Sequence, residues 1–156
     1  MANINEIMNW TFIAETSIPN EINEVLGTNY SYSEEDFIEA SKQLMQKFPS
    51  IEKVFDKIRT AVNSSWNKIR ARMWNGKEFR ETQDLDITHI IDRIGTGDAF
   101  AAGLIYGLQH FDDYKSMEFA SASSALKHTY EGDVNFSSVD EVMNILEGNI
   151  SGRLNR

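Results

Sequence analysis

The feature that most constrains the fold is a turn with two glycines, Gly95-Thr96-Gly97-Asp98, which lies between two apolar segments. The segment before it, Ile87 to Ile91, predicts a short strand, and the small apolar residues from Ala99 to Leu108 predict a helix. A strand that leads through a turn into a helix is a building unit of layered α/β folds. Strand-like and helix-like segments alternate along the rest of the chain as well, so we predict an α/β domain.

Capping residues and apolar periodicity place the other elements. Ser33 before three acidic residues is typical of a helix N-terminus, Ser138 with Glu141 forms a capping box, and Asn75-Gly76 favours a tight hairpin turn. The two glycines of the 99–108 helix, at positions 103 and 107, predict close packing on a sheet. The expected strands are Thr11 to Ala14, Val54 to Ile58, Ile69 to Trp74 and Glu78 to Glu81, and the expected helices run from near Pro19 to Gly27, from Ser33 to about Lys47, from Tyr114 to Tyr130 and from Val139 to Leu146.

The glycine turn offers the chemistry of phosphate binding. The first N–H groups of the following helix have no partner within the helix, so they form an anion pocket that the glycines leave open. Such fixed donors stabilise the charge on a transferring phosphoryl group, and the Asp98 carboxylate can accept the proton of an attacking hydroxyl. The tetrapeptide alone has an alternative interpretation, a plain turn followed by an aspartate N-cap.

Several classes of protein are disfavoured. A dinucleotide fingerprint needs a third glycine where the chain has Phe100, and the Gly-Lys-Ser/Thr run of a Walker loop is absent. The formal charge of −9 repels nucleic acid and anionic membranes, although local donors and a divalent cation still allow ATP to bind. The chain has no cysteine and only three scattered histidines, which disfavours zinc. The first residues fit neither a signal peptide nor a membrane span, so we predict a cytoplasmic location.

The run DRIGTGDAFAAGLIYGL at residues 92–108 closely resembles the second signature of the ribokinase-type carbohydrate kinases, the PfkB family. With ALKHTYEGDVN, the terminal SGRLNR and the region from Arg59 to Phe79, it is similar to the 2-dehydro-3-deoxygluconate kinases within that family. The resemblance implies the C-terminal part of a ribokinase-like three-layer α/β/α fold, with a β-hairpin at about residues 69–83. Residues 1–156 would then form a single partial domain, the nucleotide-binding and catalytic-base half of such a kinase.

The resemblance also implies roles for the residues of the glycine turn. Asp98 matches the catalytic base, which deprotonates the sugar hydroxyl. The amides of Gly95, Thr96 and Gly97, together with that of Asp98, match the anion hole. Asp92 matches an acid that orders this loop. No protein ligand for a metal is expected.

Five further positions carry weaker matches. Gly132 and Asn135 fall where family members line the adenine side, and Arg59 falls where an arginine approaches the nucleotide phosphates. For Arg59 the alternative is a solvated strand end. Lys127 and His128 have the alternative of capping the carboxyl end of a helix, where a cation is favourable.

The magnesium-associated NxxE motif of many relatives is poorly matched. Asn20 to Asn23 has the right place but ends in Asn, and Asn3 to Glu6 has the right letters but precedes the strand. Asn20 and Glu21 are therefore expected to be ordinary residues of a first helical turn.

The implied activity is ATP-dependent phosphorylation of a sugar or sugar-acid hydroxyl, most specifically that of 2-dehydro-3-deoxy-D-gluconate. ATP and Mg²⁺ are the implied cofactors, and a monovalent cation is allowed. The expected partners are the nucleotide and a small sugar-acid substrate, with no nucleic acid and no membrane. Relatives are longer and carry most sugar contacts in their amino-terminal half, so we expect a homo-oligomer or pairing with that half. The alternative is a truncated, non-catalytic fragment that binds nucleotide or forms dimers.

Overall fold

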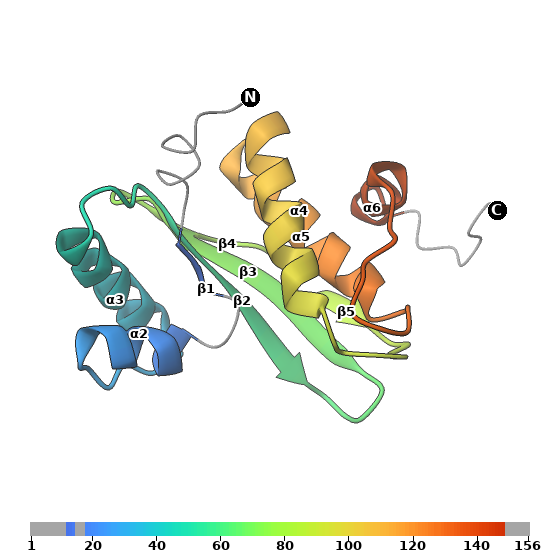
Figure 1. The fold of residues 1–156 in the computed structure, drawn as a ribbon, viewed down its shortest axis with the longest axis horizontal. Coiled ribbons are helices and arrows are strands. Elements are labelled where there is room, and N and C mark those ends of the chain that lie inside the picture. The colour runs from blue at the N-terminus through green and yellow to red at the C-terminus, as the bar shows by residue number, and fades with distance from the viewer. Residues whose placement is uncertain (1–11, 15–17, 149–156) are drawn as a thin grey trace. The chain divides into compact units, whose positions relative to one another are not determined.

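The computed structural model describes residues 12–14 and 18–148 (Figure 1). These residues divide into two compact units. The first holds the described residues up to Ile58 together with Ala71–Glu81, and the second holds Arg59–Arg70 together with the described residues from Thr82 onward. The predicted organisation as a single partial domain stays a prediction.

Within residues 12–14 and 18–148, the strands form one five-stranded set of pairings. β1 (Phe12–Ala14) runs parallel to β2 (Val54–Ala61), and β2 neighbours β3 (Asn67–Trp74). β3 pairs antiparallel with β4 (Phe79–Glu81) through Arg72–Trp74 and with β5 (Leu85–Ile87) through Asn67–Ile69. The predicted hairpin is therefore present. Four residues separate its strands rather than a two-residue turn, and Gly76 in this loop has a φ of 86°.

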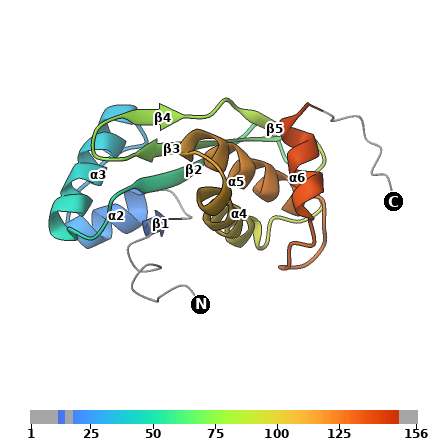
Figure 2. The same cartoon turned by 90° about the horizontal axis from the view of Figure 1, so that it is seen from above.

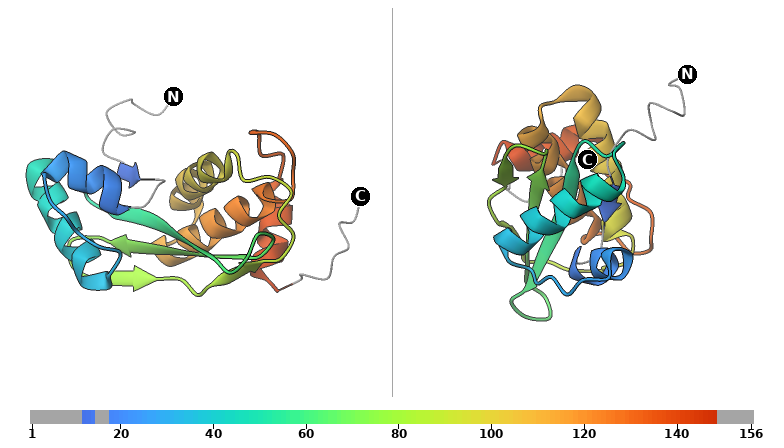
Figure 3. Two further views of the ribbon diagram at one scale, coloured as in Figure 1. Left: turned by 90° about the horizontal axis from the view of Figure 1, so that it is seen from below. Right: turned by 90° about the vertical axis from the view of Figure 1, so that its left-hand side faces the viewer.

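The first unit packs α2 (Ile18–Leu26) and α3 (Glu34–Lys47) against one another beside its strands (Figure 3). α3 begins as predicted, because the Ser33 hydroxyl accepts a hydrogen bond from the Asp36 N–H. Phe37 and Leu44 of α3 and Val54 of β2 are buried in one apolar cluster. This cluster follows the apolar stripe that the sequence places on α3.

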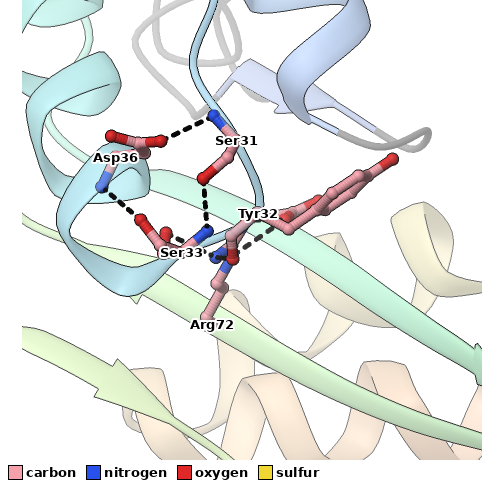
Figure 4. A network of polar contacts seen from close by, with 6 residues as sticks. Ser31, Tyr32, Ser33, Asp36 and Arg72 are labelled. Atoms are coloured by element: carbon pink, nitrogen blue, oxygen red, sulfur yellow. Dashed lines mark hydrogen bonds and ion pairs between the residues drawn. The ribbon is translucent and has the colours of Figure 1, made fainter.

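Arg72 of β3 is buried in the same unit, with 1% of its side chain exposed. It forms an ion pair with Asp56 of β2, in which its Nη2 lies 2.8 Å from Oδ2. Its Nη1 donates to the carbonyls of Tyr32 and Ser33, at 3.0 and 3.3 Å, and so holds the chain that leads into α3 (Figure 4). Because a buried guanidinium without partners would be strongly destabilising, these contacts fix Arg72 in place.

The second unit contains α4 (Thr96–His110), α5 (Asp113–Lys127) and α6 (Val139–Leu146), and α5 contacts both other helices (Figure 2). The glycines of α4 lie against α5. A Cβ added to Gly103 would lie 2.9 Å from the Cβ of Ser123, and one added to Gly107 would lie 2.8 Å from the Cα of Ser116. The expectation of close packing is confirmed, but the glycines pack against a helix and not against a sheet. The residues that they contact lie in α5, and the sequence of α4 alone does not indicate which element packs against it.

Two further expectations are corrected. The strand before the glycine turn is Leu85–Ile87, so it ends where the predicted strand begins. Residues 88–94 are irregular, and the N–H groups of Ile91 and Asp92 donate instead to the carbonyl of His128. β2 is also longer than expected.

α6 has the predicted Ser138–Glu141 capping box. Across residues 12–14 and 18–148, no helix is long and apolar enough to cross a membrane.

Candidate functional site

Gly95 forms the entry to α4. It is the N-cap residue, and its φ of 72° lies in the left-handed region that L side chains rarely adopt. A Cβ added there would lie 2.8 Å from the carbonyl carbon of Asp133 and closer still to its oxygen. Both the backbone angle and the close approach therefore require glycine. The turn is held tightly against the segment that precedes α6.

At the start of α4, hydrogen bonds hold Thr96 in place, while the carboxylate of Asp98 is exposed. The Thr96 hydroxyl donates to the carbonyl of Arg93 at 3.0 Å, and the Ser124 hydroxyl of α5 donates to the carbonyl of Thr96 at 2.7 Å. Thr96 and Gly97 are buried, whereas Asp98 is exposed. Because the N-cap is glycine, it brings no side chain to accept from the first-turn N–H groups. Such a helix start favours an anion.

Asp92 joins the loop before α4 to the turn after α5. Its Oδ1 accepts from the Ile94 N–H at 3.0 Å, and its Oδ2 accepts from the Gly132 N–H at 2.9 Å. The pKa of Asp92 is lowered, first by the hydrogen bond from Ile94, then by that from Gly132, and further down by the positive charge of Lys127. This is the geometry that a loop-ordering acid needs, while the role itself stays a prediction.

A cavity of about 400 Å³ opens beside the first turn of α4. Gly95, Asp98, Ala102 and Tyr106 line it, so it follows one face of α4 over about 12 Å, the rise of eight helical residues. The volume is typical of small-molecule sites. The cavity's other walls come from α5, from the segment before α6 and from α6 itself, and include Phe119, Ser123, Asp133, Asn135, Ser137 and Val142.

Asn135 lines this cavity, but its side chain is already engaged. Its Nδ2 donates to the Ser123 hydroxyl at 3.1 Å, and its Oδ1 accepts from the N–H and the hydroxyl of Ser137. Asn135 therefore shapes the wall by linking α5 to the segment before α6. Sequence reasoning did not identify Ser123 or Ser137, since serines in a helix or a loop carry no motif.

The structure brings together only some of the residues expected in a nucleotide site. Gly95, Asp98 and Asn135 share the cavity. Gly132 has a φ of 84° and binds Asp92 through its N–H, and it is not among the described residues that line the cavity. Arg59 lies exposed on β2 and does not line it either. Their assignment to the nucleotide stays a prediction.

The remaining candidates fall as follows. Lys127 is the last residue of α5 and His128 is its C-cap, so both lie at the carboxyl end of a helix, and both are fully buried. Asn20 and Glu21 lie in the first turn of α2, as expected. Asn3 to Glu6 and the terminal SGRLNR lie outside the described residues. Within the described residues, no three His, Asp or Glu side chains form a group that could hold a metal.

The fold, with its hairpin and a glycine turn that opens α4, is that of the ribokinase-like α/β proteins. The sequence pattern of the pfkB family carbohydrate kinases matches residues 60–140, and the chain belongs to this family. No sequence among the curated proteins matches the chain.

Solved structures share the fold. The 2-dehydro-3-deoxygluconokinase of Thermotoga maritima is 31% identical with a TM-score of 0.73, and the match covers 83% of this chain and 40% of that one. An Enterococcus faecalis protein assigned as a 2-keto-3-deoxygluconate kinase is 25% identical with a TM-score of 0.75, over 87% and 40% of the two chains. An E. coli protein assigned as ribokinase II, in complex with ATP and Mg²⁺, shares the fold at 17% identity and a TM-score of 0.61, over 93% and 42%. The chain thus spans about 40% of the length of these relatives.

Proposed function

We propose that this chain is the nucleotide-binding and catalytic-base part of a kinase that transfers the terminal phosphoryl group of ATP to a hydroxyl of a sugar acid. The observation that carries the proposal is that Gly95 and Asp98, at the start of α4, line the same cavity. An anion site and a carboxylate base are the two groups that this transfer needs from the protein. A helix start without a side-chain cap and an exposed carboxylate lie together here, which supports the proposal.

The phosphates would bind at the first turn of α4. Backbone N–H groups of Gly95, Thr96 and Gly97 are fixed by the helix, so they stabilise developing negative charge without rearranging. The anchoring of Thr96 by Ser124 and the contact of Gly95 with Asp133 keep this turn rigid. Rigidity matters because enzymes accelerate phosphoryl transfer mainly by positioning the reactants and by stabilising the transition-state charge with fixed donors.

Asp98 would act as the base. It is exposed on the cavity side of α4, where an acceptor hydroxyl could reach it. It would take the hydroxyl proton as the oxygen attacks the terminal phosphorus, and the bond from that phosphorus to the β-phosphate oxygen would break. ADP and the phosphorylated sugar acid are the products.

The residues fit a magnesium-nucleotide complex. Asp133 lines the cavity together with Asp98, and Mg²⁺ bound mainly through phosphates needs only one or two carboxylates. The ion would neutralise phosphate charge that these two acids would otherwise repel.

The preferred acceptor is 2-dehydro-3-deoxy-D-gluconate. The support comes from the two solved structures at 31% and 25% identity, which carry the name of this kinase. The other contacts to the sugar acid would come from a second polypeptide segment, either a copy of this chain or an amino-terminal half. ATP and such sugar acids are cytoplasmic metabolites, so we place the reaction in the cytoplasm.

The test is nucleotide titration followed by a kinase assay on the chain, alone and with an amino-terminal half of a relative. Asp98→Asn should lower turnover about a hundredfold or more while nucleotide affinity stays within a few-fold. Glu52→Gln removes one exposed charge in the first unit and should change neither property. Unchanged turnover in Asp98→Asn would reject the assignment of the base. ATP binding without transfer in any combination would favour a non-catalytic nucleotide-binding fragment, and a dimer without binding would favour an assembly role.

A further inference from the structure

The cavity beside α4 changes in character along its length. Near Gly95 it is lined by the two acids Asp98 and Asp133. Farther along α4 its lining residues are apolar or aromatic and come from three helices, namely Ala102, Tyr106, Phe119 and Val142. The rings of Tyr106 and Phe119 stack there with their centroids 5.1 Å apart. With phosphates at the start of α4, this far end would receive the base of the nucleotide.

The uncharged polar side chains of the wall are hydrogen-bonded to one another. The Ser137 hydroxyl donates to Asn135 Oδ1 at 2.6 Å, and Asn135 Nδ2 donates to the Ser123 hydroxyl at 3.1 Å. The Ser123 hydroxyl donates in turn to the carbonyl of Ala99 at 3.0 Å. A hydroxyl has a single proton, so both serine protons are used. Asn135 Nδ2 has its second contact, at 3.4 Å, with the carbonyl of Ser123. These three side chains therefore keep no donor for the edge of a base.

Tyr106 brings the other uncharged polar group of the wall. Its hydroxyl has no hydrogen-bond partner among the residues that the structure describes. Adenine carries an amino donor at the position where guanine carries a carbonyl acceptor. A hydroxyl rotates freely between accepting and donating, so that of Tyr106 suits both bases equally.

We propose that the cavity holds a purine by stacking and apolar contact without distinguishing adenine from guanine, so that GTP serves as a phosphoryl donor as well as ATP. The inference rests on the proposed function and extends it to the range of donors. A site that hydrogen-bonds a particular group of its ligand rejects the analogue without that group by about 10⁴-fold or more. A site that recognises a ring by its shape does not.

The transfer from GTP is the same as that from ATP. The acceptor oxygen bonds to the terminal phosphorus while its proton passes to Asp98. The bond from that phosphorus to the β-phosphate oxygen breaks, and GDP leaves in place of ADP. The base takes no part in these steps, so only its binding decides which donor is used.

Equilibrium titration of the chain tests the inference with the magnesium complexes of ATP, GTP, CTP and inorganic tripolyphosphate at one ionic strength. The dissociation constants of ATP and GTP should agree within about tenfold, because no side chain selects between their edges. CTP should bind about tenfold more weakly, since one ring covers less apolar wall than two. Tripolyphosphate should bind about a hundredfold more weakly than ATP, since it leaves the apolar end empty.

Two leucine substitutions on α4 locate the base. Ala102 is exposed and lines the cavity, and leucine is a good helix former, so Ala102→Leu should fold while narrowing the cavity. It should weaken ATP and GTP by the same factor, about tenfold or more, and leave tripolyphosphate unchanged. Gln109→Leu is the matched control, because Gln109 is exposed on the same helix and does not line the cavity. It should change none of the four affinities.

Four results would overturn the inference. The first is a preference of more than tenfold for either purine nucleotide, and the second is CTP that binds as tightly as ATP. The third is tripolyphosphate that binds as tightly as ATP, and the fourth is Ala102→Leu with wild-type affinity for ATP and GTP. The last two would place the base outside the cavity and leave the phosphate site of the proposed function standing. If none of the four ligands binds, the proposed function itself fails, and the inference fails with it.

Discussion

Replacing Gly95 with alanine should be far more damaging than a loop Gly→Ala change usually is. The residue has a φ of 72°, and an added Cβ would lie 2.8 Å from the Asp133 carbonyl carbon, whereas ordinary contact begins at 3.4 Å. The Asp133 backbone would have to move by more than half an ångström. That movement would pull on Asn135 and on its hydrogen bond to Ser123.

The magnitude follows from comparison with Gly132. This residue has a similar φ of 84°, and nothing lies within 4 Å of an added Cβ. Gly132→Ala should therefore cost only the left-handed conformation, about 1 to 2 kcal/mol. Gly95→Ala carries the same cost together with the displaced carbonyl, so we expect a loss of about 3 to 5 kcal/mol in the free energy of unfolding.

Urea unfolding of the wild type and both variants measures the difference, with the signal taken from a probe in the second unit because the two units need not unfold together. Gly95 and Gly132 both belong to that unit. Nucleotide binding should also fail in Gly95→Ala and survive in Gly132→Ala. Equal destabilisation by the two substitutions would show that the contact with Asp133 does not constrain the turn, and the account of a rigid phosphate site would fall.

Two other predictions concern the same unit. The pKa of Asp92 is lowered in the folded state, chiefly by the hydrogen bond from the Ile94 N–H, so the carboxylate stabilises the fold above its unfolded pKa and this stabilisation is lost as pH falls through the folded pKa. In Asp92→Asn, the free energy of unfolding should therefore fall less steeply with pH below about pH 4 than in the wild type. An unchanged slope in acid would contradict this. Gly107→Ala should lower the melting temperature in thermal unfolding, because the new Cβ would lie 2.8 Å from the Cα of Ser116. Alanine normally stabilises a helix interior by about 1 kcal/mol relative to glycine, so a loss would be due to this contact. A gain in stability would show that α4 and α5 are not packed closely enough to exclude a methyl group.

The elements that could be predicted from the sequence are those whose cause is local. The Ser33 cap and the Ser138–Glu141 capping box involve residues three apart, and both are present as predicted. The hairpin around Gly76 is likewise set by a few neighbouring residues. Such elements can be predicted from a few neighbouring residues, because no contact with a distant part of the chain is required to form them.

Arg72 shows why other parts could not be predicted. Arg70 and Arg72 both alternate with apolar residues along β3, yet Arg70 is partly exposed and Arg72 is not. Arg72 is buried because Asp56, sixteen residues earlier, and the carbonyls of Tyr32 and Ser33, about forty residues earlier, converge on its guanidinium. No local pattern encodes that convergence.

The candidate site combines both kinds of information. The glycine turn and Asp98 are readable as a motif, since their chemistry depends on adjacent residues. What makes the turn rigid is long-range: Asp92 binds Gly132 forty residues on, Ser124 binds Thr96, and the Asp133 backbone fills the space above Gly95. A short motif can therefore identify the chemistry of this site, but whether its N–H groups are fixed well enough to act on a phosphoryl group depends on the segment that follows α5. Substitutions that displace the Asp133 backbone should affect the site as strongly as substitutions in the motif itself.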